Sequence, residues 1–223
     1  MLETLTAQRR VARFAWVMAW IATVIGELHA LARHATEDGK ADLELPLTRA
    51  WAVPAADLLD PLLNWAEPDT VYRTYGKIWL PVFVSFTLAA FVIYRRRRPA
   101  GFEKWVWRLT LTGYGVATAS VFGDYFTPWI DQAFVITVLA LFTSLGGSTV
   151  LGIVFLRSRF RPRVTPWLLV LWIPLLMGIT QITSLGNGIL PAIWAWAIAI
   201  RWAVARGEDR ATGETLVSPR ETT

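Results

Sequence analysis

Six apolar segments, each close to the length of a membrane-spanning helix, follow one another along this chain. A helix needs about 20 apolar residues to cross the hydrocarbon core of a bilayer. Hydrophobic residues make up 54% of the chain and charged residues only 17%, which favours a membrane protein over a soluble domain. We therefore predict an all-α integral membrane helical bundle with six transmembrane helices. The predicted spans are residues 14–31, 78–94, 109–126, 133–156, 165–185 and 189–205.

Two of the predicted spans are weaker than the others. The third, 109–126, is diluted by threonines such as Thr110 and Thr118, and the sixth begins at a Gly-Asn-Gly turn soon after the fifth ends. Both are supported by the distribution of charge, because deleting the third span would place two arginine clusters on opposite sides of the membrane.

Lysine and arginine gather in alternate connections between the spans. Most of the 22 basic residues lie within 9–13, 95–108, 157–163 and 201–220, whereas the turns after the third and fifth spans contain none. Basic residues resist translocation across the membrane. The pattern predicts that both termini are cytoplasmic.

The remaining chain is divided by the same pattern. Residues 1–13 form a cytoplasmic N-terminus, 14–206 the transmembrane domain, and 207–223 a polar tail that we expect to be disordered. The acidic loop 33–77 is extracytoplasmic. Its segment AADLLDPLLNW has apolar residues at helical spacing, so it lies on the membrane interface or caps the bundle. A second interpretation of the N-terminus is a cleaved signal peptide, which would leave five spans.

Two predicted spans carry small residues at every fourth position. Such stripes let helix backbones approach closely, so we expect the third and fourth spans to pack through them. The stripes consist of Gly115, Ala119 and Gly123 in one span and of Ser144, Ser148 and Gly152 in the other.

The aromatic and basic residues near the span ends are typical of membrane flanks. Tryptophans at the ends form interfacial belts. The run Arg95, Arg96, Arg97, Arg98 abuts a span without interleaved aromatics, so it predicts contact with anionic lipid headgroups on the cytoplasmic side and no nucleic-acid partner. A membrane-protein partner or a second copy of the chain stays open. The belt residues are Trp16, Trp79, Trp105, Trp107, Trp129, Trp167 and Trp202.

The scarcity of two residue types restricts the chemistry of this chain. It contains no cysteine and two histidines, so thiolate metal sites, cysteine nucleophiles and histidine-rich metal sites are excluded. No phosphate loop, dinucleotide fingerprint or nucleophile elbow occurs. We predict no catalytic residue, no metal and no cofactor from motifs alone.

Polar groups near the outer span ends form a candidate vestibule. A carboxylate within a span is costly, so Glu27 is a functional hypothesis, and His34 follows seven residues later on the same helix face. The alternative is structural: Glu27 reaches the interface or pairs with Arg33, and the aspartates solvate helix ends. The vestibule consists of Glu27, His34, Asp124, Asp131, Gln181 and Asn187.

The C-terminal half resembles a group of uncharacterised actinobacterial multi-pass membrane proteins. The resemblance covers about residues 140–206, through GGSTVLGIVFLRSRFRPRVTPWLLVLWIPLL, a Gly-Asn-Gly turn and ILPAIWAWAIAIRWAVARG. It implies an inner-membrane protein of a high-GC bacterium and carries no activity with it.

Two functions from different classes follow from these observations. The first is a small transporter or a membrane-embedded partner subunit without catalytic chemistry of its own. The alternative is a membrane enzyme that acts on a lipid or isoprenoid substrate at the outer leaflet, with Glu27, His34 and Asp124 as acid/base groups. A transporter needs a polar path that reaches mid-membrane, and an enzyme needs a lateral opening beside its acids.

Overall fold

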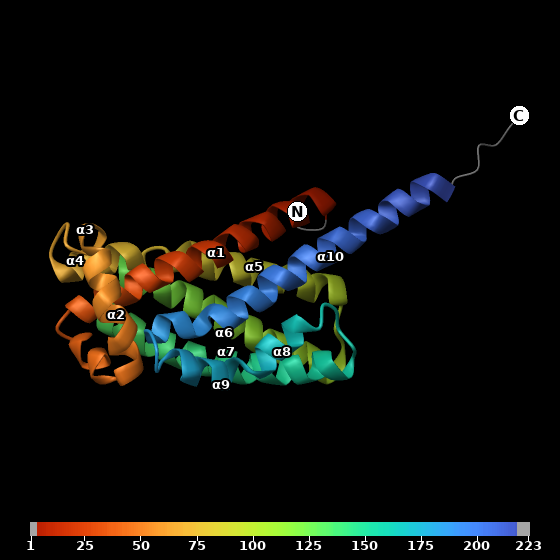
Figure 1. Ribbon diagram of the computed structural model, residues 1–223. Coiled ribbons are helices and arrows are strands. Elements are labelled where there is room, and N and C mark those ends of the chain that lie inside the picture. Colours follow the sequence, from red (N-terminus) through yellow and green to blue (C-terminus); the bar gives the residue numbers. More distant parts are fainter. Residues whose placement is uncertain (1–3, 218–223) are drawn as a thin grey trace, which may run out of the picture.

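The computed structural model of this chain describes residues 4–217, with side chains described for 4–129 and 133–208 (Figure 1). The protein is all-helical, at 85% helix, and no strand occurs among the described residues. The long helices are α1 (Leu5–Ala35), α5 (Trp79–Arg97), α6 (Gly101–Phe126), α7 (Ile130–Arg157) and α10 (Leu190–Val217). The shorter ones are η1 (Lys40–Glu44), α2 (Pro46–Leu58), α3 (Asp60–Leu63), α4 (Pro68–Gly76), α8 (Val164–Val170), α9 (Trp172–Ile179) and η2 (Leu185–Ile189).

Four helical stretches of the described chain are long and apolar enough to cross a membrane. Helix α6 is long but falls outside this group, in keeping with the polar residues that dilute it. The predicted fifth span, 165–185, is not one helix but two, because α8 ends at Val170 and α9 begins at Trp172. Pro174 lacks an N–H and its ring crowds the carbonyl four residues earlier, which explains a break at this point. The four apolar stretches are Leu5–Ala35, Pro68–Arg97, Ala133–Arg157 and Leu185–Glu208.

Segments far apart in the sequence meet at one end of the bundle. Arg9 of α1 forms an ion pair with Glu208 of α10, and the Arg96 side chain donates to the backbone oxygen of Ala203. Arg97 reaches both Glu103 and Ser158, which joins α5 to α6 and to the end of α7. We call this the arginine end.

The opposite end, which we call the loop end, is capped by α2, α3 and α4 (Figure 1). A small apolar cluster there packs Ala52, Leu63 and Val71 against Leu31 of α1. Segment 55–65, predicted to lie on the interface or to cap the bundle, packs Leu59 and Leu63 against this end of the bundle and leaves Leu58, Leu62 and Trp65 exposed, so both expectations stay open.

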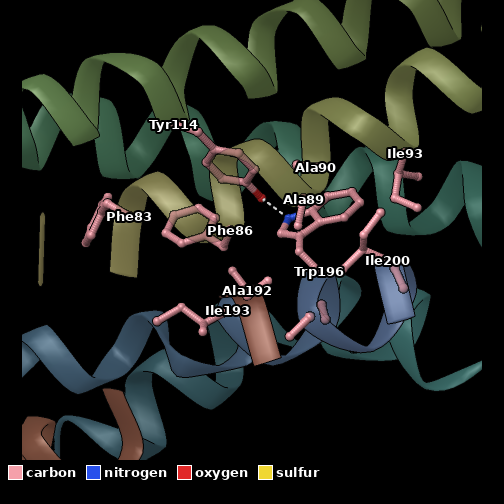
Figure 2. Close-up of a cluster of buried hydrophobic side chains, with 14 of the residues drawn as sticks. Phe83, Phe86, Ala89, Ala90, Ile93, Tyr114, Ala192, Ile193, Trp196 and Ile200 are labelled. Atoms are coloured by element: carbon pink, nitrogen blue, oxygen red, sulfur yellow. Dashed lines mark hydrogen bonds between the residues drawn. The ribbon is translucent and has the colours of Figure 1, made fainter. Parts of the chain in front are cut away.

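The centre of the bundle is aromatic. Figure 2 shows Ile193, Trp196 and Ile200 of α10 facing the side chains of α5, with Tyr114 of α6 above them. The Trp196 indole N–H donates to the Tyr114 hydroxyl over 2.9 Å. These large side chains are fully buried, so the helices pack around a dense aromatic layer.

Helices α6 and α7 form the most extensive helix contact, as predicted for the third and fourth spans, but with a different face of α6. A Cβ added at Gly113 would come within 2.6 Å of Ser144 Oγ, whereas Gly115 has no such neighbour within 4 Å. Two residues along a helix correspond to about 200° of rotation, so Gly115 and Ala119 point away from α7. Gly123 does approach α7, at Ala133.

On α7, Ser144 and Ser148 are buried as predicted, and Gly152 packs against Pro166 of α8 rather than against α6.

Helix α10 continues to Val217, so residues 207–217 of the tail predicted to be disordered are helical. The last part of that predicted tail, 218–223, lies outside the described residues.

Candidate ligand-binding cavity

A cavity of about 650 Å³ opens at the loop end of the bundle. Its lining comes from α1, the connection after it with η1, α4, α5, α6, α7 and the segment 180–189, which are brought together only by the tertiary fold. The lining changes character with depth along α6, from Asp124 and Tyr125 near the end of the helix to Val121, Ala117 and Tyr114 further in. A volume of this size lies in the range typical of small-molecule sites.

His29 lies at the centre of the aromatic part of this lining and is 3% exposed. The Trp79 indole N–H donates to its Nδ1 over 3.1 Å, and the Tyr125 hydroxyl lies 3.1 Å from its Nε2. An indole nitrogen only donates, so Nδ1 is the acceptor and a neutral ring carries its proton on Nε2. The Nε2–H group therefore donates to the Tyr125 oxygen.

Tyr72 of α4 completes this cluster. Its ring stacks on His29 with centroids 4.5 Å apart, and its hydroxyl neighbours both Arg33 and Tyr125. Gly76 at the end of α4 makes the approach of Tyr125 feasible, because an added Cβ would lie 1.9 Å from that ring. The glycine thus lets α4 and α6 close around His29.

The charged part of the lining consists of Arg33, Asp38, Asp42 and Asp124. Arg33 forms an ion pair with Asp42, with 2.9 Å between Nε and Oδ2. Arg73, an exposed residue of α4, is an electrostatic neighbour of Asp124. Arg33 lies four residues after His29, so one face of α1 supplies both groups to the cavity.

The wall formed by residues 180–189 is held by three hydrogen bonds from two other elements, α2 and α9. Thr48 donates to the Gln181 backbone oxygen over 3.1 Å, Trp51 donates to the Ile182 oxygen, and Trp172 donates to the Gly188 oxygen over 2.8 Å. These bonds satisfy backbone groups that no regular helix pairs, so the segment is fixed despite its irregular path.

Glu27 belongs to a small network behind this wall. Thr183 donates to Glu27 Oε2 over 3.1 Å, and Asn187 Nδ2 donates to Thr183 Oγ1 over 2.9 Å. Gly26 lets Asn187 approach α1, because an added Cβ would lie 2.6 Å from Asn187 Oδ1. Of these residues only Thr183 lines the cavity.

The deep end of the cavity is closed by a hydrogen-bonded set of side chains. The Tyr114 hydroxyl accepts from Trp196 over 2.9 Å and shares a second hydrogen bond with Ser148 Oγ, 2.6 Å away. The rings of Trp107 and Phe155 pack beneath, with Trp107 and Trp196 centroids 5.3 Å apart. Nothing from the arginine end lines this cavity.

One buried polar side chain of the lining has no hydrogen-bond partner in the described part of the chain. Ser184 is 3% exposed and its Oγ makes no hydrogen bond there. A buried hydroxyl without a partner is costly, and a bound ligand would supply one.

The predicted vestibule residues are only partly brought together. Asp124 lines the cavity, and Glu27 is joined to Asn187 through Thr183. His34 is buried and does not line the cavity, and Gln181 contributes a backbone oxygen to the wall. The side chain of Asp131 lies outside the described residues.

The set Glu27, His34 and Asp124 therefore does not surround one shared space, since only Asp124 lines the cavity. The predicted Glu27–Arg33 pair does not form either: Arg33 pairs with Asp42. No group of three or more His, Cys, Asp or Glu residues that could hold a metal ion occurs among the described residues.

Sequence patterns did not identify His29, Tyr72 and Tyr125 as cavity residues. They also did not predict that Trp79 is a hydrogen-bond donor inside the bundle. Trp79 and Trp107 were predicted as interfacial belt residues, but they are 3% and 0% exposed. Trp105, Trp129 and Trp167 are exposed, in keeping with a belt. The one usable signal was the i,i+4 spacing of His29 and Arg33, which places two polar groups on one face of an apolar helix.

The fold and the cavity define a class: an all-helical protein with four apolar helices long enough to cross a membrane and a ligand-sized cavity at one end. No protein-family model matches the chain, and no curated protein or solved structure shows significant similarity to it.

Proposed function

We propose that this protein is a multi-pass transporter of the bacterial inner membrane that binds a small amphipathic molecule in the cavity at its loop end. In this proposal the loop end faces outward and both termini are cytoplasmic. The gathering of the arginine clusters at the other end supports this orientation, because basic residues stay on the cytoplasmic side.

Six crossings are part of the proposal. Helix α6 packs along α7, and the pair α8–α9 leads from the arginine turn to the wall at residues 180–183. Counting α6 and α8–α9 as spans places every arginine cluster on one side. A four-span arrangement built from α1, α5, α7 and α10 would instead put the cluster at 157–163 outside, against the charge rule.

The observation that carries the function is the graded lining of the cavity. Charged groups such as Arg33 and Asp124 belong to the same lining as Phe83, Val121 and Leu141. An apolar pocket with a few placed polar groups is typical of small-molecule sites. A ligand with a polar head and an apolar body matches both parts.

The closed deep end favours transport over a static binding role. The cavity reaches Tyr114, and the layer of Trp196, Trp107 and Phe155 separates it from the arginine end. Transporters commonly bind substrate near mid-membrane and open to one side at a time. A partner subunit without a ligand of its own would leave this cavity unexplained.

The enzyme alternative has less support. A general acid or base needs a titratable group within reach of the substrate. Both ring nitrogens of His29 are engaged by Trp79 and Tyr125, and of the three predicted acid/base groups only Asp124 lines the cavity, without Glu27 or His34 beside it.

A second cavity, of about 510 Å³, supports the proposed contact with anionic lipid headgroups at the cytoplasmic leaflet. It lies at the arginine end, between α5, the turn after α7 and α10. Arginine binds phosphate groups through a planar fork of donors, and basic pockets between spans suit lipid headgroups. Its arginines are Arg96, Arg97, Arg161 and Arg206.

The transporter proposal is tested by filling the outer cavity. Ala117 lines it and is 3% exposed, whereas Ala119 lies on the exposed face of the same helix. Each is replaced by Phe, and native mass spectrometry compares co-purifying ligands, followed by uptake assays in proteoliposomes. We expect Ala117→Phe to lose ligand and uptake while Ala119→Phe keeps both. Equal ligand retention by the two variants would overturn the proposal.

A further inference from the structure

The charges that line the outer cavity are unbalanced. Its described lining holds one guanidinium, Arg33, and three carboxylates, Asp38, Asp42 and Asp124. Because Arg33 is already paired with Asp42, the lining offers no further cation to Asp38, which is exposed, or to Asp124, whose electrostatic neighbour Arg73 lies outside the lining. Asp124 is half-buried and has lost part of its hydration. Of these carboxylates it is therefore the one that a bound cation would stabilise most.

Aromatic rings lie around the same space. Tyr72 and Tyr125 both line it, with centroids 6.3 Å apart and ring planes at 61°, and Trp79 stands on the other side of His29. The face of an aromatic ring attracts a cation, most strongly when the site excludes water. His29 adds no positive charge to this ring cluster, because a Trp79 N–H occupies its Nδ1.

We infer that the polar head of the ligand is an organic cation attached to an apolar body, an inference that rests on the proposed function. The cation is a protonated amine, a quaternary amine or a similar onium group. The head lies beside Asp124 with the faces of Tyr72 and Tyr125 next to it. The apolar body extends along Phe83, Val121 and Leu141.

The unpartnered hydroxyl of Ser184 is an independent sign that the lining is completed by a ligand. Its oxygen accepts a hydrogen bond from a protonated amine or lies against the positive charge of a quaternary one. An anionic head would instead be placed beside the carboxylate of half-buried Asp124, which is unfavourable because like charges repel more strongly where water is partly excluded.

The test uses two probes of matched size and opposite charge, tetraphenylphosphonium and tetraphenylborate. The full-length protein is reconstituted in nanodiscs of zwitterionic lipid, and radiolabelled probe binding is measured by equilibrium dialysis against empty nanodiscs. We expect the cation to bind at least about tenfold more tightly than the anion, as charge selection beside a partly buried carboxylate implies. Asp124→Asn should weaken cation binding by about tenfold.

Three variants control this experiment. Asp124→Glu keeps the charge and should retain binding, which separates loss of charge from loss of fold. Asp69→Asn removes an exposed carboxylate of α4 that does not line the cavity and should change nothing. Ala117→Phe should abolish binding of either probe.

The outcomes separate the inference from the function on which it rests. Equal or tighter binding of tetraphenylborate, abolished by Ala117→Phe, overturns the cation while leaving an amphiphile-binding cavity. Cation binding that survives Asp124→Asn unchanged also overturns it. If neither probe binds above empty nanodiscs and Ala117→Phe leaves co-purifying ligands unchanged, the proposed function fails and the inference with it.

Discussion

The indole N–H of Trp79 donates a hydrogen bond to Nδ1 of His29 over 3.1 Å, linking α5 to α1 beside the cavity. The other ring nitrogen is bonded to Tyr125 of α6, so one imidazole connects three helices. His29 is therefore best understood as a positioning residue that shapes the cavity wall.

Removing the donor should destabilise the protein. Trp79→Phe keeps a ring but leaves Nδ1 of buried His29 without a partner, which costs about 1–3 kcal/mol. We expect a lower midpoint of thermal unfolding for the purified protein in detergent. Trp105→Phe, at an exposed ring, is the matched control and should leave the midpoint unchanged. A midpoint equal to that of the parent protein would mean that the Trp79–His29 bond contributes nothing.

Adding one methyl group at Gly76 should disturb the same cluster. In Gly76→Ala the new Cβ would overlap the Tyr125 ring, so α4 and α6 must separate, at a cost of about 1–3 kcal/mol. Gly178→Ala in α9 is the control, because nothing lies within 4 Å of the corresponding position. Thermal unfolding and probe binding in nanodiscs are both measured. Unaltered binding by Gly76→Ala would contradict the close approach of Gly76 and Tyr125.

The six-span topology predicts a defined labelling pattern. The chain has no cysteine, so single cysteines at Lys40, Lys104, Pro128 and Arg157 can be labelled in intact spheroplasts with a membrane-impermeant maleimide. We expect labelling from outside at Lys40 and Pro128 only, because Lys104 and Arg157 belong to the cytoplasmic clusters. External labelling at Arg157 with protection at Pro128 would indicate four spans instead.

The arginine pocket should retain anionic lipid. The double variant Arg161→Gln/Arg206→Gln removes two charges from its lining, each contributing about 1 kcal/mol near a membrane surface. Native mass spectrometry should show that phosphatidylglycerol binds about thirtyfold more weakly. Arg49→Gln, an exposed residue of α2 at the loop end, should leave the lipid signal unchanged. Equal lipid retention in both variants would show that the pocket does not select anionic headgroups.

The contacts around α6 show how far the sequence could be used. The α6–α7 pair was predicted correctly, since small residues on both helices indicate close packing. The face of α6 was not, because Gly113 and Gly115 are equally small and only the neighbouring helix decides which of them meets Ser144. Trp79 presents the same ambiguity, as a tryptophan at a span end suits both the interface and the interior.

The helical class and the division of the chain into apolar segments and basic connections follow from the sequence, because hydropathy and charge are properties of each segment alone. Which polar groups share a cavity depends instead on how the helices pack. His29, Tyr72 and Tyr125 come from three helices, and their contact depends on crossing angles and on Gly76, which no local pattern encodes. Likewise Asp124 lines the cavity while His34 does not, since their placement depends on how the helices pack in three dimensions.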